Sequence, residues 1–219
     1  MATVAILPVK HFAAAKERLG DKLTPGTRRA LAEAMFSDVL VALRRARRVE
    51  EILVVTADAG AQQIAAGHGA TPLGAEERGH TTAAELGVDW ALESGADRAL
   101  LVPGDCPLLV PAQLDQLIER AAGPRSALIV PDRHGTGTNA LLLTPPDSMA
   151  PAFGAGSRER HVVNARALGI EHEVVEVPSL ALDVDTIEDL AAVRELLAVT
   201  HGAAANTRGM LSQLLRSTM

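Results

Sequence analysis

Short apolar segments alternate with segments of helical periodicity over the first 134 residues of the chain. The apolar segments are rich in Val, Ile and Leu and bounded by Gly, Pro or Asp, which is typical of strands buried in a parallel sheet. They are "TVAILPV" (3–9), "EILVVT" (51–56), "ATPLG" (70–74), "RALLVPGD" (98–105) and "SALIVPD" (126–132). Strands that alternate with helices are joined by right-handed crossovers, which place helices on both faces of the sheet. The alternation therefore predicts an α/β fold with a mostly parallel sheet.

After residue 134 the alternation is less regular, with two further strand-like segments and two helical ones. These are "TNALLLT" (138–144), a helix at about 158–168, "HEVVEV" (172–177) and "TIEDLAAVRELLAVT" (186–200). There is no internal repeat and no linker between two cores, so we expect a single three-layer α/β domain over residues 1–200. Residues 201–219 carry Gly and Ala breaks and a weak helical pattern. We expect this tail to pack loosely or to serve a partner.

Composition excludes several classes of protein. Hydrophobic residues form 47% of the 219, enough for a large core, but no apolar run approaches the roughly 18 residues needed to span a membrane. The start, "MATVAILPVKHF", lacks the pattern of a signal peptide. A formal net charge of −6 and an aromatic content of 2% argue against a nucleic-acid surface. The single cysteine, Cys106, excludes an internal disulfide and a Cys-based zinc site. We expect a cytoplasmic protein with no membrane or nucleic-acid partner.

One glycine motif invites a functional interpretation that its context contradicts. "GTGTNA" (135–140) matches the G-x-G-x-x-A form of the dinucleotide-binding fingerprint. That fingerprint must open a helix, whereas "LLLTPP" follows here and is strand-like. The chain also lacks the G-x-x-x-x-G-K-[ST] phosphate loop. We therefore expect neither a dinucleotide site nor a P-loop enzyme.

The segment "LLVPGDCPLL" (100–109) runs from a predicted buried strand directly into a carboxylate, Asp105. In open α/β sheets, ligands bind outside the carboxyl ends of the strands, where Asp105 is expected. The alternative is that Asp105 caps the next helix or turns the chain. The segment alone leaves both interpretations open.

A second pair of carboxylates lies in "SLALDVDTIEDL" (179–190). Asp183 and Asp185 alternate with Val184, so in an extended chain both project to the same side, and a cation between them would relieve their repulsion. Asp185 and Glu188 also fit a helix capping box. Thr186 with Asp189 is an alternative cap that would free both aspartates, and the sequence leaves metal ligation and capping open.

The loop after the first predicted strand is basic. Lys10, Lys16 and Arg18 occur within nine residues in "ILPVKHFAAAKERLG" (6–20). They form either a solvated basic segment or a cationic loop suited to a nucleoside triphosphate. In a doubly wound sheet this loop can meet the three aspartates at one end of the sheet. Carboxylates that leave room for substrate phosphates suit Mg²⁺, and such a site is expected to catalyse phosphoryl or nucleotidyl transfer.

Three segments together carry a family resemblance: "LPVKHFAAAKERL", "VPGDCPLL" and "LDVDTIEDL". In this order they resemble the CofC-type guanylyltransferases of coenzyme F-420 biosynthesis, over about residues 3–198. The resemblance implies the fold of the molybdenum-cofactor and sugar nucleotidyltransferases. It also implies that GTP reacts with phosphoenolpyruvate or 2-phospho-L-lactate and that pyrophosphate leaves. The guanosine-diphosphate-linked acid would pass to the deazaflavin precursor, so functional coupling to the downstream transferase is expected.

The resemblance assigns residues to the metal and to the acid. It implies that Asp105, Asp183 and Asp185 bind Mg²⁺. "GTGTNALLL" is similar to the family's substrate strand, in which Thr138 would contact the acid. "FGAGSRERH" is similar to its Gly-x-x-Ser turn, in which Gly154 and Ser157 would hold the carboxylate. Independently of the family, backbone amides and a Ser hydroxyl at a helix start form an anion site.

Nucleotide contacts are expected from two loops. We expect Lys10, Lys16 and Arg18 to contact GTP, and Lys10, Lys16 and Asp105 to carry catalysis. Where a Gly-Leu-Asn run is expected after the third strand, this chain has "RGHTTAAE" (78–85), with His80 and Thr81 in the Leu and Asn places. Gly79 and Thr81 are therefore the expected contacts from that loop.

Two alternatives to this function stay open. One is a related nucleotidyltransferase that acts on a molybdopterin or sugar phosphate, although the "LAGGxSxRxG" signature of such enzymes is replaced here by "LPVKHFAAAKERL". The other is a protein that binds a nucleotide without turnover. Within the CofC-type interpretation, the Ala- and Arg-rich composition resembles the actinobacterial members, for which phosphoenolpyruvate is the implied acid. We therefore expect phosphoenolpyruvate to be preferred.

Overall fold

A seven-stranded mixed sheet forms the centre of the molecule. The computed structural model describes the chain except residues 21, 76–78, 122, 201 and 218–219. The strands follow the order β3-β2-β1-β4-β6-β5-β7, and β6 is antiparallel to both of its neighbours while the other pairs are parallel. The strands are β1 (Thr3–Pro8), β2 (Glu51–Thr56), β3 (Thr71–Gly74), β4 (Arg98–Leu101), β5 (Ser126–Pro131), β6 (Thr138–Thr144) and β7 (Glu171–Val174).

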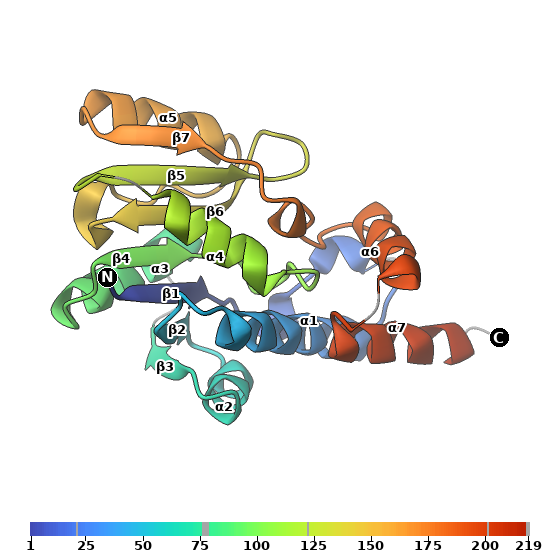
Figure 1. Cartoon of the computed structure of the whole chain (residues 1–219). Helices are drawn as coiled ribbons and strands as arrows, with labels where there is room; N and C mark the ends of the chain where they lie inside the picture. Colours follow the sequence, from blue (N-terminus) through green and yellow to red (C-terminus); the bar gives the residue numbers. More distant parts are fainter. Residues whose placement is uncertain (21, 76–78, 122, 201, 218–219) are drawn as a thin grey trace.

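Helices cover both faces of this sheet (Figure 1). The described helices are α1 (Pro25–Arg45), α2 (Ala59–Gly67), α3 (His80–Glu93), α4 (Pro111–Arg120), α5 (Ser157–Ala167), α6 (Ile187–Val199) and α7 (Ala205–Ser217). Apolar residues of α1, α2 and α4 pack against one face, and those of α3 and α5 pack against the other. The predicted three-layer α/β fold with a mostly parallel sheet is thus confirmed.

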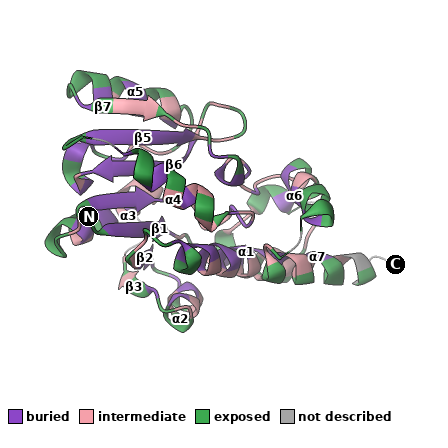
Figure 2. Cartoon of the chain, in the orientation of Figure 1, coloured by how far each residue is buried: buried purple, intermediate pink, exposed green. Residues whose placement is uncertain are grey.

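The two cores follow from alternation along the strands. In β1, Ala5 and Leu7 face the layer of α1, α2 and α4, whereas Val4 and Ile6 face α3. All four are almost fully buried, as the central strands in Figure 2 are. Because both faces are covered, the strand is apolar throughout, as the sequence indicated.

Helix α3 approaches β1 unusually closely at Gly87. A Cβ atom added there would lie 2.3 Å from Cγ2 of Ile6 and 3.3 Å from Cγ2 of Val55. A side chain at this position would therefore push the helix away from the sheet. The contact fixes the height of α3 above β1, and with it the position of the first turn of α3.

The C-terminal segment differs from the loose packing expected for residues 201–219. Its described part forms α7, which runs along α1 (Figure 1). The buried Asp38 carboxylate of α1 accepts hydrogen bonds from the backbone N–H and side-chain amide of Asn206, at 3.1 and 2.9 Å. It also accepts from the backbone N–H and hydroxyl of Thr207, both at 2.7 Å. Leu211 adds an apolar contact. A weak helical pattern becomes a packed helix here because a distant carboxylate holds its first turn.

No described helix combines the length and the apolar character that a membrane crossing requires.

Candidate active site

The candidate site lies where the parallel strands terminate, which we call the carboxyl end of the sheet. The β1–α1 loop and the segment after β4 begin here. Because β6 is antiparallel and Leu141 pairs with Leu101, Thr138 at the start of β6 lies at the same end. The segment before α6 joins them, since the backbone N–H of Val184 donates to the carbonyl of Asp105 at 3.2 Å. The predicted convergence of three distant segments is therefore seen in the fold.

Lys16 connects two of the three predicted carboxylates. Its ammonium forms an ion pair with Asp105 Oδ2 and donates to Asp185 Oδ1 at 3.1 Å. The Lys16 side chain is only 7% exposed, and its backbone is left-handed, with φ of 58°, which is uncommon for a residue other than glycine. Burial lowers the pKa of Lys16, but the charges of Asp105 and Asp185 outweigh burial and raise the pKa above its ordinary value. Lys16 is therefore charged at neutral pH.

Negative charge exceeds positive charge among these groups. Burial raises the pKa of Asp183, and the charge of Asp105 raises it further, while a hydrogen bond of 3.1 Å from the Asn139 amide lowers it. Arg18 lies 3.8 Å from Asp185 but is 75% exposed, so its contribution is screened by water. Three carboxylates thus lie near one another, with one buried ammonium that contacts two of them.

One oxygen of Asp105 has the properties of a cation ligand. Its Oδ1 atom is buried and has no hydrogen-bond partner among the described residues. A buried carboxylate oxygen left without a partner is costly, and a hard cation would satisfy it. In the described part of the chain, no group of three or more His, Cys, Asp or Glu side chains is arranged so that it could hold a metal ion. The unpartnered Asp105 oxygen suits a hard cation such as Mg²⁺, which usually retains waters and substrate phosphates as its other ligands.

The two capping alternatives are resolved by the structure. Thr186 is the N-cap of α6 and forms a capping box with Asp189. Asp189 also accepts from the backbone N–H of Asp185 at 3.0 Å and pairs with Arg133 at 2.5 Å. Asp183 and Asp185 are therefore not needed as caps. Asp105 is not a cap either, because α4 begins after Val110 without a side-chain cap.

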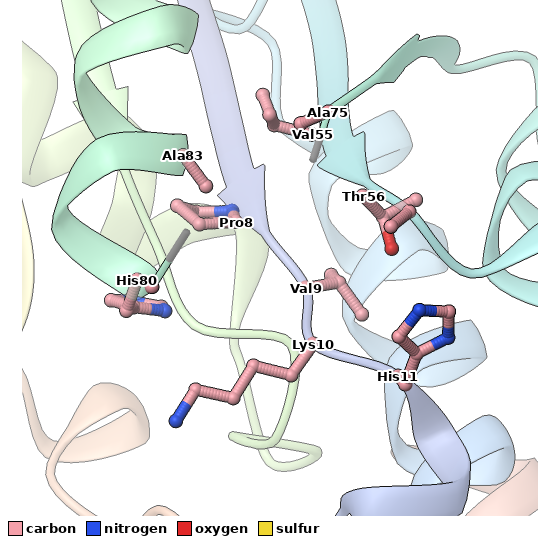
Figure 3. A pocket seen from close by; sticks show the side chains of 11 residues that line it. Pro8, Val9, Lys10, His11, Val55, Thr56, Ala75, His80 and Ala83 are labelled. Atoms are coloured by element: carbon pink, nitrogen blue, oxygen red, sulfur yellow. The ribbon is translucent and has the colours of Figure 1, made fainter. Parts of the chain in front are cut away.

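A pocket lies beside the carboxylates, between β1, β2 and α3 (Figure 3). Its lining residues are Pro8, Val9, Lys10, His11, Val55, Thr56, Ala57, Ala75, Gly79, His80 and Ala83. Lys10 is exposed, and its side chain extends away from that of His11 on the same loop (Figure 3). Burial lowers the pKa of His80, Asp105 raises it and Lys10 lowers it, so His80 lies within reach of both charges. The pocket has one cationic side and mostly apolar walls.

The predicted nucleotide residues of α3 occupy its first turn. Gly79 is the N-cap and lines the pocket, and Thr81 follows His80 in the helix. Arg78 of the "RGHTTAAE" segment lies outside the described residues. The β1–α1 loop opposite is held by Asp58, which accepts from the backbone N–H of Phe12 at 3.0 Å while capping α2.

The predicted acid-binding residues gather between β6 and α5. The Thr138 hydroxyl lies 2.9 Å from His161 Nδ1 of α5. Gly154 has a φ of +108°, which favours glycine, and its carbonyl accepts from the backbone N–H of Ser157 at 3.0 Å. Ser157 is buried at the start of α5. Arg160 stabilises this turn by donating to the carbonyls of Ala152, Phe153 and Ala155.

Several residues at the site were not among the predicted ones. Asn139 donates to Asp183 and also to the carbonyl of Leu180, at 2.7 Å. His161, Asp189 and Asp58 each hold a loop that carries predicted site residues. Asn139 lies in the segment "GTGTNALLL", where a polar residue in an apolar strand could have indicated a role at the site. The sequence indicated Asp189 only as a capping partner of Thr186, and the contacts of His161 and Asp58 join segments that are far apart in the sequence.

Solved structures identify the fold of the chain. A Desulfovibrio desulfuricans protein assigned as a nucleotide-diphospho-sugar transferase superposes with a TM-score of 0.77 at 17% identity, covering 97% of this chain and 95% of that chain. A 4-diphosphocytidyl-2C-methyl-D-erythritol synthase gives 0.63 at 19% identity, covering 90% and 98%. At these identities the likeness concerns the fold alone. The chain has the fold of the nucleotide-diphospho-sugar transferases.

Sequence comparison identifies the family. Residues 3–218 match the model of the protein family described as "Guanylyl transferase CofC like". A phosphoenolpyruvate guanylyltransferase of Conexibacter woesei is 54% identical over 219 residues, covering 99% of this chain and 98% of the relative. A 2-phospho-L-lactate guanylyltransferase of Methanothermobacter thermautotrophicus is 35% identical, covering 98% and 92%. A 3-phospho-D-glycerate guanylyltransferase of Colwellia psychrerythraea is 34% identical, covering 91% and 92%. The chain belongs to the CofC guanylyltransferase family.

Proposed function

We propose that this protein transfers the guanylyl group of GTP to phosphoenolpyruvate, with release of pyrophosphate, as a step of coenzyme F-420 biosynthesis. The observation that carries the proposal is the 54% identity, over nearly the full length of both chains, to the phosphoenolpyruvate guanylyltransferase of Conexibacter woesei. The charges and the pocket at the carboxyl end of the sheet support it. We place the reaction in the cytoplasm and expect the product to pass to the next transferase of the pathway.

The bond changes are those of nucleotidyl transfer. A phosphate oxygen of the acid attacks the α-phosphorus of GTP, and a new phosphorus–oxygen bond forms. The bond from the α-phosphorus to the oxygen that bridges to the β-phosphate breaks, and pyrophosphate leaves with that electron pair. The attacking phosphate is ionised at neutral pH, so no general base is required. The protein must instead offset repulsion between two anions and hold them in line.

Charged residues at the carboxyl end of the sheet are suited to that task. Lys16 is charged and buried between Asp105 and Asp185, so it would meet GTP phosphates as they enter. Lys10, which lines the pocket, and the exposed Arg18 would add positive charge toward the triphosphate. Gly79 and Thr81 would place the start of α3 against the nucleotide, since helix N-termini favour anions.

The three aspartates would hold the metal. Mg²⁺ would be bound by the buried Oδ1 atom of Asp105 and by the carboxylates of Asp183 and Asp185. When bound, the ion neutralises phosphate charge on the attacking and leaving oxygens. Asn139 would keep the Asp183 carboxylate directed to the site, and Asp189 would fix the backbone at Asp185.

The acid would bind on the far side of β6, through Thr138, Gly154 and Ser157. Its carboxylate would accept hydrogen bonds there while its phosphate faces the aspartates. Phosphoenolpyruvate and 2-phospho-L-lactate differ at one carbon, planar in the first and tetrahedral in the second. Such small differences are worth about 1–3 kcal/mol, so we expect a preference for phosphoenolpyruvate together with some turnover of the lactyl acid.

The test is competition between equimolar acids for limiting GTP and Mg²⁺, with pyrophosphate measured and products separated by mass. We expect pyrophosphate in proportion to product, and mainly the enolpyruvyl adduct. Asp105→Asn serves as the low-activity control. Loss of one such electrostatic contact commonly lowers the rate by about 10² to 10³. A mainly lactyl product would reverse the choice of acid. GTP binding without any pyrophosphate would favour a nucleotide sensor, and turnover only with a sugar or molybdopterin phosphate would favour a related transferase.

A further inference from the structure

A histidine outside the predicted set lies directly behind the proposed acid subsite. His161 of α5 is fully buried. Its Nδ1 atom lies 2.9 Å from the Thr138 hydroxyl, and its Nε2 atom lies 2.9 Å from the backbone nitrogen of Ala152. The ring of Phe153 packs edge-on against it, with centroids 5.4 Å apart. One imidazole therefore contacts both the start of β6 and the turn that carries Gly154.

The contact with Ala152 determines which ring nitrogen carries the proton. A backbone N–H can only donate, so His161 Nε2 must accept and has no hydrogen. In the neutral imidazole the hydrogen is then on Nδ1, which donates to Thr138. Burial lowers the pKa of His161 to about 4, and Arg160 contributes to the decrease. The ring is therefore neutral at physiological pH, and the tautomer is fixed by geometry.

The direction of the hydrogen bond determines what Thr138 can offer to a ligand. Its oxygen accepts from His161, so its own hydrogen is available to another acceptor. If Thr138 donated to His161 instead, its oxygen would direct lone pairs toward the ligand. The first arrangement attracts a carboxylate and the second repels it.

We propose that His161 is a positioning residue that makes the Thr138 hydroxyl a hydrogen-bond donor to the carboxylate of the acid substrate. The inference rests on the proposed function, because it concerns the acid subsite of that reaction. The same imidazole holds Ala152, two residues before Gly154, so the hydroxyl and the anion-binding turn are placed relative to each other by one ring. His161 itself touches no substrate.

Substitutions separate this role from simple packing. Thr138→Val removes the hydroxyl and keeps the shape, and His161→Leu removes both ring nitrogens. His161→Asn keeps an amide nitrogen one bond beyond Cγ, where Nδ1 lies, and can still donate to Thr138. His172→Leu is the matched control, since His172 lies in the edge strand β7 and bonds to the carbonyl of Ile170.

Steady-state kinetics with phosphoenolpyruvate, GTP and Mg²⁺ give the first readout. We expect Thr138→Val and His161→Leu each to raise the KM for phosphoenolpyruvate roughly tenfold, the size of one hydrogen bond to a charged group. The KM for GTP should change by less than about twofold. The double variant should resemble Thr138→Val alone, because coupled residues are not additive. His161→Asn should recover most of the loss.

The outcomes distinguish failure of the positioning role of His161, of the acid subsite and of the proposed function. Additive effects of Thr138→Val and His161→Leu, or an equal rise in both KM values, would overturn the positioning role and leave the subsite intact. If Thr138→Val leaves the KM for phosphoenolpyruvate unchanged, Thr138 does not bind the acid. That result would contradict both the proposed acid subsite and the positioning role of His161. If the unaltered protein releases no pyrophosphate from GTP and phosphoenolpyruvate, the proposed function itself is contradicted. Nitrogen NMR of labelled histidine tests the tautomer in the unaltered protein without turnover, and hydrogen on Nε2 of His161 would overturn the inference even if the Leu variant fails to fold.

Discussion

At the scale of single residues, the candidate site holds more negative than positive charge, and burial raises the free-energy cost of this imbalance. Burial and the nearby charges of Asp105 and Asp185 raise the pKa of Asp183, and Lys16 is a buried cation that contacts Asp105 and Asp185. Exposed ion pairs contribute little to stability, but removing one partner of a buried pair leaves an uncompensated charge. Lys16 thus offsets the charge of two of the carboxylates, and in the proposed function the same ammonium also binds the phosphates of GTP.

Lys16→Met is expected to raise the KM for GTP by about tenfold or more and the KM for phosphoenolpyruvate much less, since the ammonium is proposed to meet the triphosphate. Initial rates over a grid of both substrates measure the two constants. Arg29→Met, which breaks an exposed pair with Glu33 of 2.7 Å within α1, is the control for loss of a positive charge. A lower melting temperature with unchanged constants would instead support a purely structural role for Lys16.

The neutral buried His161 makes stability depend on pH. Its pKa is about 4 in the folded state against 6.5 for an exposed histidine, so between these values the unfolded chain binds the proton more readily. The free energy of unfolding should therefore fall as pH drops from 6.5 toward 4, by up to about 1.4 kcal/mol per pH unit. Urea unfolding at pH 7 and pH 5 measures the fall. His80, whose pKa is also lowered, adds to it.

His161→Asn should reduce this pH dependence, because the substituted side chain does not titrate. The comparison is the difference in free energy of unfolding between pH 7 and pH 5 in the two proteins. An equal difference in both would show that His161 is not the group that titrates.

At the scale of elements, α3 is placed by the contact of Gly87 with Ile6 and Val55. The first turn of this helix borders the pocket beside Lys10 and His80. A displacement of α3 would therefore act on stability and, under the proposed function, on nucleotide binding.

Gly87→Ala is expected to destabilise the protein by about 1–3 kcal/mol, because the added methyl would overlap Ile6. Gly209→Ala in α7 is the matched control: nothing lies within 4 Å of its added Cβ, so it should be neutral or stabilising by up to about 1 kcal/mol. Chemical denaturation of both variants gives the comparison. Equal stability of the two would show that α3 moves away from the sheet without cost.

At the scale of the whole molecule, a third apolar cluster joins the β1–α1 loop and α1 to the C-terminal segment of the chain. It includes Leu19 after the Lys16 turn, Val184 between the two aspartates, Val193 of α6 and Leu211 of α7. The C-terminal helix is therefore part of the support for both the basic loop and the acidic segment.

Asp38→Ala should loosen α7, because it removes a buried carboxylate with four hydrogen bonds and leaves the N–H groups of Asn206 and Thr207 unsatisfied. We expect a loss of about 1–3 kcal/mol in the free energy of unfolding and faster amide exchange in α7 than in α3. Asp115→Ala, which removes an exposed acceptor for the backbone of Arg48, is the control. Unchanged exchange in α7 would mean that apolar contacts alone hold the helix.

The local patterns were sufficient for the architecture and for part of the site. Apolar runs such as 51–56 and 98–101 became strands with helices between them, because strand and helix periodicities are properties of neighbouring residues. Asp105 was placed at the carboxyl end of the sheet because a buried strand ends just before it. The resemblance of three short segments to the CofC family was confirmed over residues 3–218.

Other features depend on contacts between residues far apart in the sequence. Lys16 is 89 residues from Asp105 and 169 from Asp185, and its position between them follows from the order of the strands, not from the loop that contains it. The insertion of β6 antiparallel between β4 and β5 brings Thr138 and Asn139 to the site, and periodicity carries no information on strand direction. The packing of α7 on Asp38 and of His161 behind Thr138 was equally inaccessible. Local periodicity determined the elements of this protein, whereas only tertiary packing decided which polar groups are buried together, because that depends on how the elements are arranged in space.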